Sequence, residues 1–327
     1  MLDSQQFLPC YNYATDDTSM PCADLWFLQK DKPLADPARL KLLNTPTHRE
    51  LARQVVIEGA VLLQNNGILP LSVGDSPQVA GQARRYRIVL VGPSAGCADN
   101  ATDCSALREQ VGGYTGWSPT AVSLLAAAYN GSLPAHVSVS YYPGTKSWTS
   151  NDTSGFAEAV VAAKDADVVV AAVGDGDRTC GEAQDRTNIE LPGVQPELLS
   201  AIADTGIPVV AVLIHGRPVS FERLDLLSKL SAVVAAWRPG AQGGPALWSL
   251  LTGKENFSGK LAQAWTRSTA WIHTQVNPWF SKRRGGRYHS SRKFLTPREP
   301  GGSLLCICSV FSMLQVACAS LCRSHNA

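Results

Sequence analysis

The stretch VVVAAVGDGDRTCGEAQDRTNIELPGVQ, residues 168–195, decides the fold. It opens with an uninterrupted apolar run, residues 168–173, which is typical of a parallel strand buried on both faces. Glycines then end this run, and a helical pattern begins at Gln195, where Pro196 suits the first helical turn. The stretch therefore predicts a strand, a loop and a helix in succession, which is the repeating unit of α/β folds.

Charged side chains crowd the loop that follows this strand. Because open α/β sheets bind ligands at the carboxyl ends of their strands, the loop is the first candidate for a functional site. Its charged residues are Asp175, Asp177, Arg178, Glu182, Asp185 and Arg186.

The same alternation of strand and helix patterns continues through most of the chain. Strands are predicted at 88–91, 137–142, 168–173, 208–214 and 232–237, and helices at 119–129, 155–164, 196–204, 221–230 and 243–251. An earlier helix is expected after Thr47, an N-cap with Glu50 completing a capping box, and it ends near Gly59 or continues toward Leu63. The predicted fold class is α/β, with a mostly parallel sheet flanked by helices on both faces.

Composition narrows the class of protein. The chain has 327 residues, of which 45% are hydrophobic and 17% charged, as in a soluble globular α/β protein. A formal net charge of +2, without a basic stripe interleaved with aromatic residues, gives no reason to expect nucleic acid as a partner. His48 and His215 are expected to be structural, and no cysteine or histidine spacing indicates a metal site.

Several motifs together resemble family 3 glycoside hydrolases, the β-glucosidase and β-xylosidase group. The motif G-E-A-Q-D-R-x-x-I-x-L-P-G-x-Q, residues 181–195, is similar to the loop that carries the acid/base in that family. Four further segments are similar to the family in its order and spacing: 48–71, 87–95, 112–117 and 237–265. The resemblance spans residues 45–265, and several motifs in the right order are a far stronger signal than one.

The resemblance implies a domain organisation. Residues 46–270 would form the family's second domain, an αβ sandwich, preceded by an extended lead-in, 1–45, and followed by an apolar, cysteine-rich tail, 271–327. In the family the nucleophile lies on a (β/α)8 barrel of ~250 residues that precedes this domain. Only 47 residues precede the matching segment at His48. We therefore expect a carboxyl-terminal half without its barrel, and a tail that is truncated or frame-shifted.

Glu182 is the catalytic residue that the resemblance implies. Retaining hydrolysis needs two carboxyl groups about 5 Å apart, one a nucleophile and one an acid/base, and Glu182 matches the acid/base position. An ordinary solvated loop glutamate is the alternative. Asp185 and Arg186 are expected to hold the shape of the loop. Where β-xylosidase-like members carry an acidic residue, two positions before the catalytic glutamate, this chain has Cys180, which leaves the substrate subclass open.

Other residues are candidates for binding sugar. Asp175 and Asp177 could form hydrogen bonds with sugar hydroxyls, although a solvated loop edge is an equally good account. Tyr114 and Trp117 could offer faces on which a sugar ring stacks. For Trp237 a core position is the better expectation.

The functional expectation is a retaining, exo-acting β-glycosidase that hydrolyses O-glycosyl bonds of β-linked xylosyl or glucosyl substrates and needs no cofactor. One alternative is a non-catalytic sugar-binding or interaction module. Another is a structural protein anchored in a membrane by residues 303–322, a stretch of twenty residues without a charge.

Several features favour the secretory route. Cys97 and Cys104 could pair within one loop, as in proteins of oxidising compartments. Asn-x-Ser/Thr tripeptides, the acceptors of N-linked glycans, occur at Asn100, Asn130, Asn151 and Asn256. The amino terminus itself shows no basic and then apolar run of the kind that a signal peptide has.

Overall fold

The structure, a computed structural model, describes residues 43–74, 78–79, 82–97, 104–115, 118, 120–131, 133–263 and 265. The chain divides into two compact units, Met1–Ala52 and Arg53–Ala327. The second unit contains the sheet described below. The expectations for the tail and for almost all of the lead-in concern residues outside those described.

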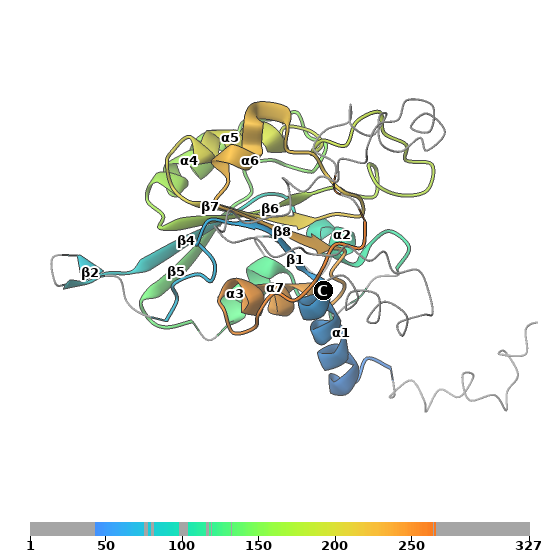
Figure 1. Ribbon diagram of the computed structural model, residues 1–327, viewed down its shortest axis with the longest axis horizontal. Helices are drawn as coiled ribbons and strands as arrows, with labels where there is room; N and C mark the ends of the chain where they lie inside the picture. The colour runs from blue at the N-terminus through green and yellow to red at the C-terminus, as the bar shows by residue number, and fades with distance from the viewer. Residues whose placement is uncertain are drawn as a thin grey trace, which may run out of the picture. The chain divides into compact units, whose positions relative to one another are not determined.

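One six-stranded sheet organises the second unit, with the strand order β1-β8-β7-β6-β4-β5 (Figure 1). The strands are β1 (Val61–Asn65), β4 (Tyr86–Val91), β5 (Val137–Tyr142), β6 (Val168–Gly174), β7 (Val209–Ile214) and β8 (Ala232–Trp237). Every pairing is parallel except that of β1, which lies antiparallel to β8 at one edge. The chain passes from β4 outward to β5 and then returns to the other side of β4 as β6, so the β4–β6 boundary is a topological switch point.

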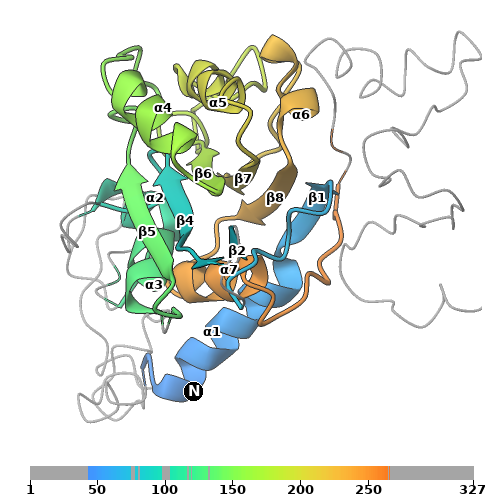
Figure 2. The same ribbon diagram turned by 90° about the vertical axis from the view of Figure 1, so that its left-hand side faces the viewer.

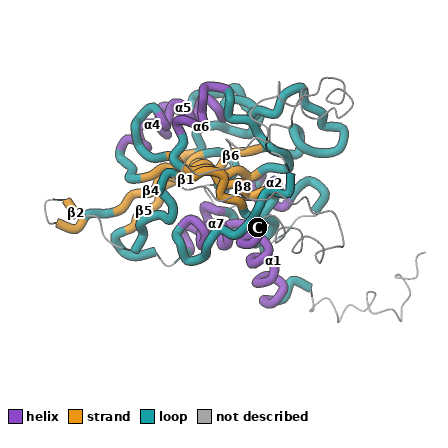
Figure 3. Tube along the Cα trace, viewed as in Figure 1, coloured by secondary structure: helices purple, strands orange, loops and turns teal. Residues whose placement is uncertain are grey.

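Helices cover both faces of this sheet. On one face lie α3 (Leu124–Asn130), α7 (Gly243–Leu251) and the end of α1 (Pro46–Gly59). On the other lie α4 (Phe156–Lys164), α5 (Gln195–Ala203) and α6 (Leu226–Lys229). Figure 2 shows the two helical layers with the strands between them, and Figure 3 shows the same layering by secondary structure. The α/β class with a mostly parallel sheet is therefore confirmed.

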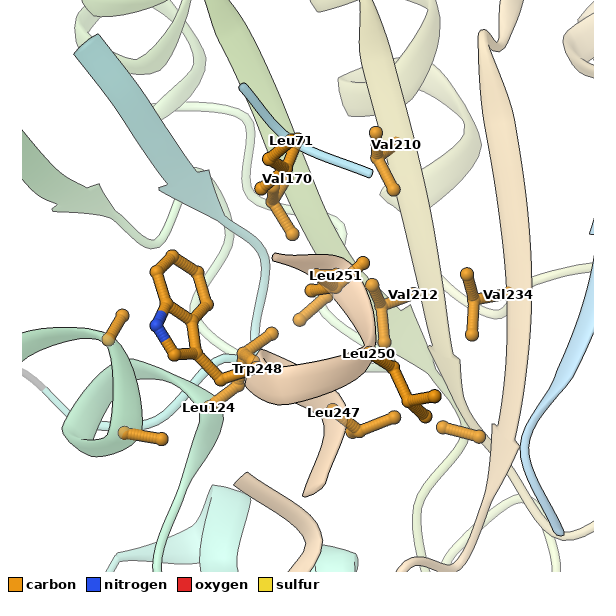
Figure 4. Packing of buried hydrophobic residues seen from close by; sticks show 14 of the residues in the cluster. Leu71, Leu124, Val170, Val210, Val212, Val234, Leu247, Trp248, Leu250 and Leu251 are labelled. Carbon is orange, nitrogen blue, oxygen red and sulfur yellow. The ribbon is translucent and has the colours of Figure 1, made fainter. Parts of the chain in front are cut away.

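Strand periodicity explains why the sheet has two cores. Successive side chains of a strand point to opposite faces, so alternate residues of β6 enter different clusters. Val168 and Val170 pack with α7, whereas Val169 and Val173 pack with α5. All seven residues of β6 are buried. Figure 4 shows the first cluster, where Val170, Val212 and Val234 face the leucines of α7.

The first helix differs from the sequence expectation at its beginning. It starts at Pro46, and the Oγ1 atom of Thr45 accepts a hydrogen bond from the backbone N–H of His48 at 3.3 Å, so Thr45 rather than Thr47 caps it. It ends at Gly59, and Val61–Asn65 forms strand β1 instead of a continued helix. Strand β1 was missed because its apolar residues also fit a helical period.

Two other helices are shorter than the sequence patterns suggest. The helix expected at 119–129 begins at Leu124, where the Oγ atom of Ser123 accepts a hydrogen bond from the N–H of Ala126 at 3.1 Å. The helix expected at 221–230 is a 3-10 turn, η5 (Arg223–Asp225), followed by α6. Positive φ angles of 60° at Leu224 and 48° at Asp225, within η5, interrupt the expected helix just before α6.

Three elements appear where no regular structure was expected: α2 (Ser105–Val111) and the hairpin strands β2 (Gln78–Val79) and β3 (Gln82–Ala83). Cys97 and Cys104 form a disulfide just before α2, which confirms the suggested pairing. Across the described ranges, no helix has both the length and the apolar character needed to cross a membrane.

Candidate active site

Three polar residues directly follow three adjacent parallel strands. Asp175 follows β6, His215 follows β7 and Arg238 follows β8. The carboxyl ends of parallel strands meet at one edge of the sheet, so these side chains converge beside the switch point. Asp175 and His215 are both 0% exposed. The edge is therefore built around buried polar groups, each of which requires a partner.

Arg238 joins the strand ends to helix α2. Its Nη2 atom donates to Oδ1 of Asp175 at 2.7 Å, and its Nη1 atom donates to the backbone oxygens of Glu109 at 2.7 Å and Asp175 at 3.1 Å. Nη1 also lies 3.4 Å from Oε2 of Glu109. The N–H of Gly216 donates to the same Oδ1 of Asp175 at 3.0 Å. These bonds hold the ends of β6, β7 and β8 in one arrangement.

Burial changes the charge balance of this network. It raises the pKa of Asp175, although Arg238 and the N–H of Gly216 favour the ionised carboxylate. Burial also raises the pKa of Glu109, against the N–H of Asp177 and the charge of Arg238. Oδ2 of Asp175 has no hydrogen-bond partner among the described residues. Asp175, a candidate for sugar binding, thus makes its contacts here with protein groups, through Oδ1.

His215 is held neutral in an aromatic setting. Its Nδ1 atom lies 2.8 Å from the backbone oxygen of Arg217 and donates to it, which leaves Nε2 without a proton. The ring lies 4.9 Å from that of Trp237 and 5.3 Å from that of Trp265, measured between centroids. Burial lowers the pKa of His215 to about 4. These contacts agree with the structural role expected for this histidine.

The loop after β6 begins with a tight turn and then carries Glu182 into solvent. The backbone N–H groups of Thr179 and Cys180 both donate to the oxygen of Gly176 at 2.9 Å. Glu182 is exposed, and its own N–H donates to the hydroxyl oxygen of Tyr114 at 2.7 Å. Within the described residues its carboxylate forms no hydrogen bond or ion pair. The backbone of Glu182 is thus held while its carboxyl group is free to contact a ligand.

Two arginines hold the part of this loop that follows Glu182 through hydrogen bonds. Nη2 of Arg186 donates to Oδ1 of Asn188 at 2.9 Å and to the oxygen of Glu190 at 2.7 Å. Nη2 of Arg217 donates to the oxygen of Gln184 at 3.1 Å. Asp185 is exposed and, in the part of the chain that the structure describes, forms no ion pair with Arg186.

The remaining candidates are distributed around the loop. Tyr114 is 78% exposed and touches the loop through its hydroxyl group, and Asp177 is exposed beside Glu109. Trp117 lies outside the described residues. Cys180, a free cysteine, packs against Gly216. Among the residues described, no three histidine, cysteine or acidic side chains are grouped so that they could hold a metal ion.

Sequence reasoning missed Arg238 and Glu109. Arg238 could have been found, since it directly follows a correctly predicted strand at the edge where ligands bind. No comparable signal pointed to Glu109, because the short helix that carries it was not expected. Its contact with Arg238 joins residues 129 positions apart.

Comparison with known proteins gives the family. The Glycosyl hydrolase family 3 C-terminal domain matches residues 60–295. The chain belongs to glycoside hydrolase family 3. Its mostly parallel sheet with flanking helices is the αβ-sandwich architecture that the motifs suggested.

Relatives within family 3 include xylosidases and glucosidases. A β-xylosidase of Formosa agariphila is 33% identical over 79% of this chain and 34% of its own length. An exo-1,4-β-xylosidase of Emericella nidulans is 34% identical over 72% of this chain and 26% of its own length. A solved β-glucosidase from Listeria innocua, in complex with gluconolactone, matches 78% of this chain and 32% of that protein, with 27% identity and a TM-score of 0.58. The chain thus spans about a third or less of the relatives that it matches.

Proposed function

We propose that this chain supplies the acid/base domain of a retaining, exo-acting β-glycosidase of the β-xylosidase or β-glucosidase class. The observation that carries the proposal is Glu182: an exposed carboxylate, without a partner among the described residues, on a loop at the switch point, with its backbone N–H donating to the hydroxyl oxygen of Tyr114 at 2.7 Å. Relatives named as β-xylosidases and a β-glucosidase support the substrate class, a β-linked xylosyl or glucosyl unit.

Glu182 takes part in both halves of the proposed reaction. In the first, its carboxyl proton passes to the glycosidic oxygen while a second carboxylate bonds to the anomeric carbon and the leaving group departs. In the second, the Glu182 carboxylate removes a proton from water, which displaces the enzyme carboxylate from the sugar. The nucleophilic carboxylate, which must lie about 5 Å away, is supplied from outside the matched domain, by the barrel that the family resemblance implies.

The residues around Glu182 support this role in two ways. Arg238, Asp175 and Gly216 fix the base of the loop through buried hydrogen bonds, so the loop begins from a rigid edge. Tyr114 contacts the loop and Asp177 belongs to it, and both side chains are exposed, so an aromatic face and a carboxylate can meet a sugar ring and its hydroxyls.

The proposal also includes the limits of the domain and the location of the protein. We place the catalytic-support domain at residues 46–270. We place the protein in the secretory pathway or outside the cell, where the Cys97–Cys104 disulfide would persist.

The test compares Glu182 variants in an active enzyme. This chain replaces the matching part of the Emericella exo-1,4-β-xylosidase, and Glu182→Ala is assayed in this hybrid with aryl β-xylosides and β-glucosides. Without its proton donor, the enzyme should hydrolyse substrates with poor leaving groups about 10²–10⁴-fold more slowly. With nitrophenyl-type substrates, the rate of glycosidic bond cleavage should fall much less. Azide should restore turnover, because this anion attacks the glycosyl-enzyme without help from a base.

A matched control separates the acid/base role from general damage. Glu158 is an exposed carboxylate on α4, in the helical layer away from Tyr114, and Glu158→Ala should leave every rate unchanged. If Glu182→Ala lowered the rate of hydrolysis equally for substrates with good and poor leaving groups, the acid/base assignment would be contradicted. The unjoined chain should show little or no turnover. Glu182-dependent hydrolysis by that chain would place the nucleophile within it, and sugar binding without hydrolysis in either form would favour a binding module.

A further inference from the structure

Four Asn-x-Ser/Thr tripeptides are not used by the proposed catalytic function, and the structure describes the asparagine of three of them. Asn130, Asn151 and Asn256 are all exposed. Asn100 lies outside the described residues. The amide nitrogen Nδ2 is the atom that carries an N-linked glycan, so the local contacts of each side chain decide whether a glycan fits the folded protein.

The side chains of these three asparagines make no hydrogen bonds among the described residues. Two asparagines outside such tripeptides, Asn65 and Asn188, behave differently. Asn65 uses its Nδ2 atom to bond the oxygen of Leu69 at 3.0 Å and its Oδ1 atom to bond two backbone N–H groups, which builds a turn. Asn188 accepts a hydrogen bond from Arg186. Among the described residues, the tripeptide asparagines therefore form no side-chain hydrogen bond that a glycan would disrupt.

Asn130 and Asn256 lie at the ends of two neighbouring helices. Asn130 is the last residue of α3, and the following Gly131 packs closely against Trp248 of α7. Asn256 comes shortly after α7, and the adjacent Glu255 is fixed by its N–H bond to the oxygen of Ser249 at 3.1 Å. Both side chains thus project from a well-held backbone.

Asn130 is far from the β6 loop along the strand direction. The segment that follows it reaches the start of β4, where the N–H of Tyr86 donates to the oxygen of His136 at 2.8 Å. That is the amino edge of the sheet, whereas Glu182 follows the carboxyl end of β6. A glycan on Asn130 would leave the candidate active site uncovered.

Asn151 lies on the same edge of the sheet as the candidate site. It follows β5, and the neighbouring Ser150 accepts a hydrogen bond from the N–H of Val194 at 3.0 Å, at the end of the β6 loop. Its turn is held by the N–H of Asp152, which donates to Oγ of Ser150 at 3.1 Å. A glycan here would border the loop that carries Glu182.

We infer that Asn130, Asn151 and Asn256 are sites of N-linked glycosylation. The donor is an oligosaccharide linked to a lipid diphosphate. The Nδ2 atom of asparagine forms a bond to the anomeric carbon, the bond from that carbon to the diphosphate oxygen breaks, and the amide loses one proton while the lipid diphosphate departs. The disulfide between Cys97 and Cys104 supports this inference independently, since the compartment that forms disulfides in eukaryotic cells is also the one that adds these glycans.

The test uses the complete chain behind a cleavable secretory leader, translated in the presence of eukaryotic microsomes and also secreted from a eukaryotic host. Each of Asn130→Gln, Asn151→Gln and Asn256→Gln should remove one step of the glycosylation ladder on a gel. Enzymatic release of the glycans, which converts each modified asparagine to aspartate, should mark the same three positions by mass spectrometry.

Hydroxyl-swap variants and an unmodified asparagine serve as controls. Ser258→Thr should keep the glycan on Asn256 and Ser258→Ala should abolish it, and Thr153→Ser and Thr153→Ala should do the same for Asn151. Asn66→Gln should change nothing, because Asn66 is exposed but is not followed by the required hydroxyl residue.

Two results would overturn the inference. One is a chain from which the leader has been cleaved but which carries no glycan at these asparagines. This result can be observed whether or not the chain folds. The other is a glycosylated chain whose glycans resist enzymatic removal until it is unfolded, since that would contradict the exposed positions seen here. Catalytic inactivity of the secreted chain would bear on the proposed function and leave this inference untouched.

Discussion

Buried polar side chains at the strand ends show how position sets protonation. His215 and Asp175 are both withdrawn from water, and burial favours the neutral form of each. It therefore lowers the pKa of the histidine to about 4 and raises the pKa of the aspartate. The two residues should consequently affect stability in opposite directions as pH falls.

The first prediction concerns His215 and pH. Its folded pKa of about 4 lies below the ordinary 6.5, so the unfolded chain binds the proton first and stability is lost as pH falls from 6.5 toward 4. That loss should be about 3 kcal/mol at 1.36 kcal/mol per pH unit. Urea unfolding of His215→Asn, whose amide can still donate to the oxygen of Arg217, should lack this part of the pH dependence. Asp175 and Glu109 titrate in both proteins, so their contribution cancels in the comparison. Parallel curves for the two proteins would show that His215 is not held neutral.

The second prediction concerns the link between Tyr114 and Glu182. Removing the hydroxyl in Tyr114→Phe leaves the N–H of Glu182 without its acceptor, and one such bond is worth about 0.5–1.5 kcal/mol. Amide hydrogen exchange at Glu182 should therefore accelerate by about 2–10-fold in this variant. Exchange in β6 should stay unchanged. If the Glu182 amide exchanged at its original rate, the hydrogen bond would not restrain the loop.

At the scale of elements, a close approach between β4 and β6 limits which residue can stand at the switch point. Gly92 directly follows β4 with a φ of +97°, and a Cβ atom there would lie 2.2 Å from the backbone oxygen of Ala172 in β6. A backbone oxygen within a paired strand cannot move aside cheaply. Only glycine lets the chain turn away from β4 at this position.

The third prediction compares two glycines with similar backbone strain. Gly92→Ala adds both the strain of a positive φ and a backbone clash, so the loss of unfolding free energy should be at least about 3 kcal/mol. Gly206 has a φ of +80° but open space around its Cβ position, so Gly206→Ala should cost only about 1–2 kcal/mol. Equal losses in chemical denaturation would mean that β4 and β6 separate easily.

The fourth prediction concerns the packing of α7 on the sheet. Leu250 is 1% exposed within the cluster that Figure 4 shows, so Leu250→Ala should leave a cavity and cost about 2–5 kcal/mol. Val161→Ala on α4 is the matched control, because its side chain is 64% exposed, and it should change stability by less than about 0.5 kcal/mol. A small effect at Leu250 would indicate that α7 packs loosely.

At the scale of the whole molecule, the two helical layers share one sheet. Each strand contributes alternate residues to both clusters, so neither layer can leave without exposing the same strands. The fifth prediction is therefore one cooperative unfolding transition. Tryptophan fluorescence and far-ultraviolet circular dichroism should give the same midpoint, and Leu250→Ala and Leu199→Ala, in opposite layers, should each shift both signals together. Separate midpoints would show that the layers unfold independently.

Local pattern was enough for much of the architecture. The apolar runs at 168–173, 208–214 and 232–237 predicted three strands to within a residue, because buried strands require continuous apolar residues and tolerate little else. The alternating residues at 137–142 predicted the half-buried edge strand β5. The motif around Glu182 led to the family. Strand β1 was missed because five residues cannot show whether their period is that of a strand or a helix, and pairing with β8 decides it.

Amino-acid sequence alone thus determined the α/β class, the family and the position of the candidate loop, since all three depend on short-range order along the chain. The charge states of Asp175, Glu109 and His215 were decided by tertiary structure, because burial and the approach of Arg238 arise only when three strand ends and α2 meet. The same holds for the exposed carboxylate of Glu182, whose backbone is held by a tyrosine 68 positions away.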